Sequence, residues 1–182
     1  MKGRCVLTLL VPALLASTAV QAHGADAWDS LGPARIGASF DEVSRSTALA
    51  CKKEAAPQVC AVSSQTPIAF AGVAATNIEA MFDDYRLQRI RVSLGIWQYE
   101  ELLRILTARY GEGEDHGFVA IAGMSGDFAA GVFVWRTGAL SLVLEQYAGK
   151  IDRSALTYGT ESSMAGLVRK VNAYARGARR DL

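Results

Sequence analysis

The stretch "MFDDYRLQRIRV", residues 81–92, decides the fold, because it has the pattern of two strands joined by a tight turn. Arginines and apolar residues alternate in its second half, with one irregularity near Gln88. The acidic pair Asp83 and Asp84 separates the two alternating segments, as is typical of a β-hairpin. We expect an antiparallel hairpin in which the arginine-bearing face of the second strand is exposed to solvent.

Parts of this pattern recur along the chain. The stretch "VWRTGALSLVLE" (134–145) resembles the hairpin at a shift of 53 residues. In the same way, "SFDEVSRS" (39–46) resembles "QYEELLRI" (98–105) at a shift of 59 residues, so the first unit has six more residues between its two matches. The matches predict a tandem repeat of one helix followed by three strands. Chance similarity over such short stretches is the alternative.

The stretches at 39–46 and 98–105 have the pattern of helix starts. Ser39 is followed three residues later by Glu42, which predicts a capping box. Gly111 stands where a glycine commonly ends a helix. Apolar residues recur at helical spacing on one face of the second helix, at Tyr99, Leu102, Leu103, Leu106 and Tyr110.

The order of these elements predicts an α+β fold. Runs of strands follow each helix, which favours an antiparallel sheet with the helices on one face rather than a parallel sheet. We expect helices over 39–50, 97–110 and 160–177, and strands near 67–72, 77–83, 86–94, 117–122, 130–136, 139–147 and 154–158.

Residues 1–22 have the layout of a secretory signal peptide, with a basic start, an apolar run and small residues up to Ala22. The apolar run is shorter than the ~20 residues of a membrane-spanning helix. We expect cleavage after Ala22 and a periplasmic or secreted chain, while a buried N-terminal helix is the alternative. The mature chain then divides into a first α+β unit with the cysteine loop, 23–95, and a second with the C-terminal helix, 96–182.

The mature chain is nearly neutral. Lys2 and Arg4 leave with the signal peptide, so 17 of the 19 basic residues stay beside 18 acidic residues. A nucleic-acid-binding protein carries a basic excess, so we expect no nucleic-acid partner. No later apolar run is long enough for a membrane span, so we expect no transmembrane segment in the mature chain.

Two cysteines, Cys51 and Cys60, follow the signal peptide. An even count in an exported chain predicts a disulfide, which would close the short polar loop "CKKEAAPQVC". The alternative is a redox or metal pair. We favour the disulfide, because redox motifs have two intervening residues and neither another cysteine nor a nearby histidine completes a zinc site.

Three short motifs carry a resemblance to known families. "RIGASFDEV" (35–43) is similar to the helix opening of small outer-membrane-assembly lipoproteins of the SmpA/OmlA type. The tandem layout resembles β-lactamase inhibitory proteins, and "LLRILTARYGEGE" (102–114) after "RLQRIRVSL" (86–94) resembles exported bacterial proteins of periplasmic type. The resemblance implies a protein-binding role in the cell envelope. The chain departs from the lipoproteins because no cysteine stands at its cleavage site.

The histidines offer one candidate metal site. After cleavage at Ala22, His23 would present its imidazole and the free α-amine together, and His116 in the polar stretch "GEGEDHG" could complete a copper site. This resembles copper-dependent polysaccharide monooxygenases, although the rest of the chain lacks their motifs. The alternative places both histidines on ordinary surface segments.

The sequence contains no catalytic signature. "GMSGD" (123–127) lacks the glycine that a nucleophile elbow needs two residues after the serine. We therefore expect a non-enzymatic protein that binds a protein partner in the cell envelope, as an assembly accessory or as an inhibitor-like binder. A copper-binding protein that uses His23 is the alternative.

Overall fold

The computed structural model describes residues 30–31, 34–51, 58–63, 69–70, 72–123 and 126–178. The predicted signal peptide and its cleavage point lie outside these residues. In the described part of the chain, no helix is both long and apolar enough to cross a membrane.

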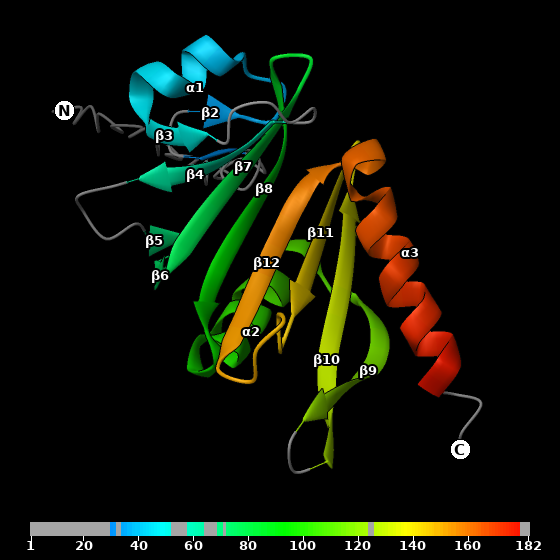
Figure 1. Cartoon of the computed structure of the whole chain (residues 1–182). Helices are drawn as coiled ribbons and strands as arrows, with labels where there is room; N and C mark the ends of the chain where they lie inside the picture. Colours follow the sequence, from blue (N-terminus) through cyan, green and yellow to red (C-terminus); the bar gives the residue numbers. More distant parts are fainter. Residues whose placement is uncertain are drawn as a thin grey trace, which may run out of the picture.

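The described chain forms an eight-stranded antiparallel sheet with helices packed on it, which confirms the predicted α+β class (Figure 1). The sheet order is β3-β4-β7-β8-β12-β11-β10-β9. Its strands are β3 (Ala48–Cys51), β4 (Gln58–Ser63), β7 (Asn77–Asp83), β8 (Arg86–Gly95), β9 (Glu114–Gly123), β10 (Gly126–Thr137), β11 (Leu140–Glu145) and β12 (Arg153–Thr160). The other elements are the strand pairs β1 (Ser30–Leu31) with β2 (Ala34–Arg35) and β5 (Ala69–Phe70) with β6 (Val73–Ala74), the helices α1 (Phe40–Ser46), α2 (Tyr99–Tyr110) and α3 (Glu161–Ala178), and the 3-10 turn η2 (Ile96–Gln98).

The hairpin predicted from residues 81–92 is formed by β7 and β8. Its two turn residues, Asp84 and Tyr85, have φ angles of 46° and 56°. Such left-handed turns match the twist of the flanking strands. Phe82 pairs with Leu87 while Met81 pairs with Arg89, so Gln88 is the extra residue that the irregular alternation indicated.

The helix ends are set by local hydrogen bonds. Ser39 and Glu42 form the predicted capping box at the start of α1, and Gly111 ends α2 with a φ of 81° and its N–H bonded to Thr107 O at 2.9 Å. The prediction of one helix over 39–50 is wrong in its second half. The helix ends at Ser46 and the chain turns into β3, because pairing with β4 competes successfully with the local helical pattern.

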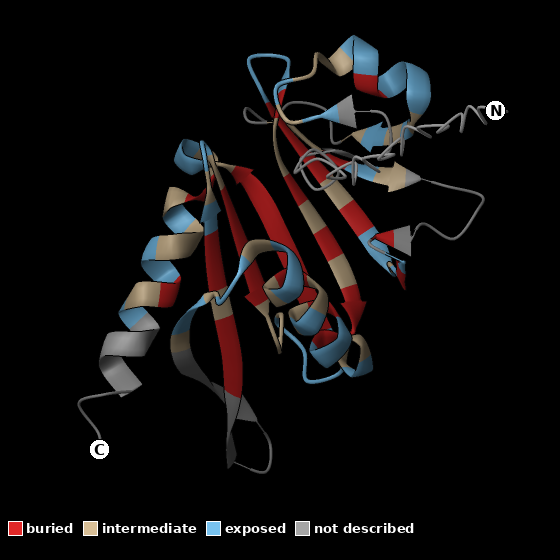
Figure 2. Cartoon of the chain, turned by 180° about the vertical axis from the view of Figure 1, so that it is seen from behind, coloured by how far each residue is buried: buried red, intermediate tan, exposed pale blue. Residues whose placement is uncertain are grey.

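The helices lie on both faces of the sheet, which corrects the prediction that they share one face. Leu142 and Leu144 on β11 belong to the main core with α1 and α2, while Val143 between them packs under α3. Because side chains alternate along a strand, α3 covers the opposite face. Buried residues run along both β11 and its neighbours (Figure 2). On this second face, Val132 and Val134 of β10 provide the apolar surface against which the buried residues of α3 pack.

Each of α1 and α2 is followed by four strands of the sheet rather than three, and the two halves join through β8 and β12. The sequence match at a shift of 53 aligns β7 and β8 with β10 and β11. These two strand pairs do not occupy equivalent positions, because β8 belongs to the central strand pair of the sheet and neither β10 nor β11 does. The matched residues Ile90 and Val143 point to opposite faces. The repeat and the division at residue 95 stay predictions.

Candidate functional site

Within the described residues, one part of the sheet surface has little helical cover. The helix α3 packs on β9, β11 and β12 and reaches β8, while the same face of β4 and β7 lies beyond it (Figure 1). Among the described helices, α1 and α2 pack on the other face. We call the α3-side surface of β4, β7, β8 and β12 the open face.

Strand register brings charged, hydroxyl and apolar side chains together on the open face. Glu79 on β7 lies opposite Arg91 on β8, which in turn lies opposite Thr157 on β12. In the adjacent row, Met81 lies opposite Arg89. These residues line a cavity of about 120 Å³, together with Val59 from β4 and Leu167 from α3.

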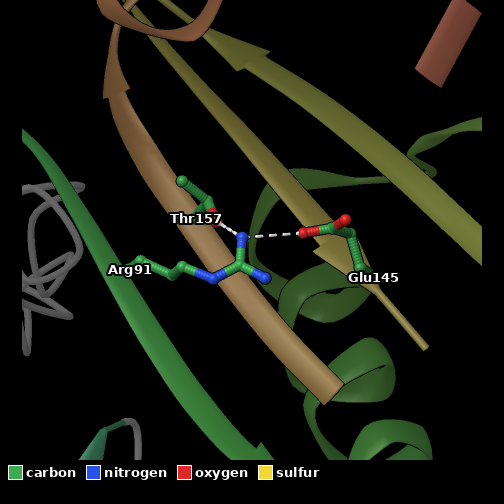
Figure 3. Close-up of polar contacts among 3 residues, drawn as sticks. All are labelled: Arg91, Glu145 and Thr157. Carbon is green, nitrogen blue, oxygen red and sulfur yellow. Dashed lines mark hydrogen bonds and ion pairs between the residues drawn. The ribbon is translucent and has the colours of Figure 1, made fainter. Parts of the chain in front are cut away.

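Arg91 is held by two hydrogen bonds from one guanidinium nitrogen. Its Nη1 donates to Glu145 Oε2 at 3.0 Å and to Thr157 Oγ1 at 3.2 Å. Figure 3 shows the side chain reaching from β8 across β12 to β11. The contact is an ion pair with Glu145, whose side chain is only 19% exposed. The Arg91 charge is therefore satisfied within the protein and helps to hold three strands in register.

Arg89, unlike Arg91, has no carboxylate partner among the described residues. Its Nη1 donates to the carbonyl oxygen of Ser163 in α3 at 3.2 Å, and no described carboxylate lies within ion-pair distance of its guanidinium. Burial lowers the pKa of Arg89, the positive charge of Arg91 lowers it further, and the charge of Glu79 raises it. The repulsion from Arg91 thus outweighs the attraction from Glu79 at this position.

The open face suits contact with another macromolecule better than enclosure of a small molecule. Its cavity is well below the ~300–1,000 Å³ of most small-molecule pockets. The apolar wall formed by Val59, Met81 and Leu167 adjoins the two arginines. Arginine and methionine beside apolar area are enriched in protein interfaces.

Only one residue of the predicted copper site, His116, lies within the described residues. His116 lies in β9 rather than in a loop, with its side chain 15% exposed, and its Nε2 is 3.3 Å from Glu114 Oε2. Glu114 also accepts a hydrogen bond from Arg136, which lowers the pKa of Glu114 against the opposing effect of burial, and His116 lowers it further. His23 lies outside the described residues, and within them no group of three His, Cys, Asp or Glu side chains could hold a metal ion. The pairing of His23 with His116 stays a prediction.

The predicted disulfide is present in the structure. Cys51 and Cys60 are bonded and lie directly opposite one another on β3 and β4, with a Cα–Cα distance of 4.0 Å. Cys60 is fully buried in the main core. The bond therefore joins two neighbouring strands of the sheet.

The open face was missed as a site by reasoning from sequence. The alternation around Arg89 and Arg91 correctly placed both arginines on one side of β8, but it indicated a fully solvated face. Both residues are half-buried, because α3 returns along this side of the sheet.

Comparisons of this chain with known protein families, with curated proteins and with solved structures found no match. The resemblance to assembly lipoproteins and to β-lactamase inhibitory proteins therefore stays a prediction.

Proposed function

We propose that this chain is an exported, periplasmic, non-enzymatic module that binds a protein partner in the cell envelope through its open face. The observation that carries the proposal is the partly uncovered sheet surface, on which Arg89, Glu79 and Met81 lie side by side and no helix of the described residues packs over β4 and β7. The two halves of the fold, which we interpret as repeated α+β units, form this surface together at β8 and β12.

The chemistry of the open face supports a protein ligand. Met81 is only 9% exposed, while Glu79 and Arg91 beside it are partly exposed. Partly exposed charged groups beside apolar side chains are a common composition of protein interfaces. Export agrees with the disulfide between Cys51 and Cys60, because such bonds persist in oxidising compartments. Within this proposal the chain acts as an assembly accessory or as an inhibitor-like binder.

Site-specific photo-crosslinking tests the proposal. A photo-reactive amino acid in place of Ala61, which is exposed on the open face next to Glu79, should give a discrete covalent adduct with an envelope protein. The matched control carries the same residue in place of Ala108, exposed on α2 on the other side of the sheet. The proposal fails if neither position gives an adduct, or if the Ala108 position gives the same adduct at equal yield.

A further inference from the structure

The two arginines of β8 are unequally neutralised. Arg89 and Arg91 are two residues apart on one strand, so their side chains lie on the same face of the sheet. The Arg91 guanidinium is paired with Glu145 at 3.0 Å. The Arg89 guanidinium has five N–H donors, and the one hydrogen bond found for it among the described residues goes to an uncharged carbonyl, that of Ser163.

Glu79 does not neutralise Arg89. The register places Glu79 opposite Arg91, whereas Arg89 faces Met81. The carboxylate of Glu79 is farther than 4.0 Å, the ion-pair limit, from the guanidinium of either arginine. The bond to Ser163 holds the Arg89 guanidinium at the start of α3. Arg89 therefore lines the cavity, and most of its guanidinium N–H donors have no partner among the described residues.

We propose that the open face recognises an acidic side chain, aspartate or glutamate, of its protein partner, and that this carboxylate binds Arg89 in the cavity between β7, β8 and α3. The proposal rests on the proposed function and adds the chemistry of the partner. A planar guanidinium binds a carboxylate through two parallel hydrogen bonds, which are among the stronger polar contacts that proteins form.

The size and walls of the cavity fit this group. A volume of about 120 Å³ is well above the ~10–15 Å³ of probe-occupied space that one water needs, so the cavity has room for the acetate-like end of an acidic side chain. Val59, Met81 and Leu167 would contact its methylene groups. The Arg89 guanidinium, with which no described carboxylate forms an ion pair, favours an incoming anion.

Titration of the isolated protein with small probes tests the inference without the partner. N-acetylglutamate amide should give saturable NMR shifts at the Arg89 Nε–H and at the Thr157 amide, at constant ionic strength. N-acetylglutamine amide, which has the same shape without the charge, should give none. Equal shifts with both amides, or none with either, would overturn the inference. Inorganic phosphate that binds as tightly as the glutamate probe would also overturn it, because the site would then be a general anion site.

Two substitutions with opposite expected effects sharpen the test. Arg89→Gln should weaken binding of the glutamate probe about tenfold, as expected for loss of a charge-assisted bidentate contact. Glu79→Gln should tighten binding several-fold, because it removes a competing negative charge while leaving Arg89 and its bond to Ser163 in place. Arg153→Gln, an exposed arginine at the start of β12, is the matched control and should leave binding unchanged.

The outcomes separate this inference from the proposed function. If a crosslinked adduct forms at Ala61 but Arg89→Gln and Glu79→Gln leave probe binding unchanged, the open face binds its partner through other contacts and the inference is wrong. If probe binding follows both substitutions but no adduct forms at Ala61, the protein-binding function fails, and with it the assignment of the carboxylate to a protein partner, although Arg89 still binds carboxylates.

Discussion

At the scale of single residues, the contact between Tyr99 and Gly131 shows how tightly the main core is arranged. Tyr99 on α2 is 3% exposed, and its hydroxyl has no hydrogen-bond partner among the described residues. Burial raises the pKa of this hydroxyl, and the charges of Glu100 and Asp115 raise it further. A side chain at Gly131 would place its Cβ 2.7 Å from the Tyr99 oxygen. Glycine is therefore favoured at position 131 because the Tyr99 hydroxyl lies so close to its Cα, and not because of an unusual φ.

This contact predicts a rescue between two substitutions. Gly131→Ala should lower the free energy of unfolding by about 1–3 kcal/mol, as overpacking of a core does. Tyr99→Phe removes the clashing oxygen and with it a buried, unpaired hydroxyl, so the double variant should recover most of that loss. Urea denaturation measures both effects. Gly166→Ala, which meets nothing within 4 Å on α3, is the control and should be neutral or stabilising. A double variant as unstable as Gly131→Ala would show that the clash lies elsewhere.

Prediction of individual residues from the sequence succeeded where the cause is local. Ser39 with Glu42 and Gly111 act through hydrogen bonds to their neighbours along the chain, so their roles at helix ends could be predicted. The environment of Arg89 could not be predicted, because it depends on Ser163, a residue 74 positions away in α3. The preference for glycine at position 131 likewise depends on a residue distant in the sequence, Tyr99 of α2.

At the scale of elements, β3 shows why the predicted helix was too long. Only four residues form this strand, at one edge of the sheet, and their local sequence "ALAC" does not oppose a helix. The strand is held by pairing with β4 and by the disulfide to Cys60. Long-range contacts of this kind override weak local preference, as often happens for strands.

The disulfide should therefore stabilise the edge of the sheet. The chain-entropy model gives about 2–3 kcal/mol for a closed loop of this length, so the Cys51→Ala/Cys60→Ala double variant should lose at least that much, and more if the buried Cys60 site leaves a void. Reduction of the wild type is the control that keeps both side chains. Hydrogen exchange should rise first in β3 and β4. Unchanged stability and unchanged exchange after reduction would contradict the prediction.

At the scale of the whole molecule, the two halves share one core. Residues of the first half, such as Ile78 and Leu87, and residues of the second, such as Leu144 and Leu156, belong to the same buried cluster. The central strands β8 and β12 pair along seven residues. The sequence predicted the antiparallel arrangement, but not the joining strand pair or the side of the sheet that α3 covers, because both depend on contacts between distant elements.

The shared core predicts that the described part of the chain unfolds as one cooperative unit. Leu156 is fully buried on β12, opposite Val92 on β8 and Leu144 on β11. Leu156→Ala should lower the free energy of unfolding by about 2–5 kcal/mol, with a single transition and an equal loss of amide protection in both halves. Leu140→Ala, at a half-buried position on β11, is the matched control and should cost less.

The opposite result would be equally informative about the organisation of the chain. Two transitions, or loss of protection confined to one half, would mean that the first and second α+β units fold separately despite their common sheet. That outcome would support the predicted division into 23–95 and 96–182. A single transition would instead mean that the open face, which takes residues from β7 in one half and β12 in the other, exists only when the whole sheet is formed.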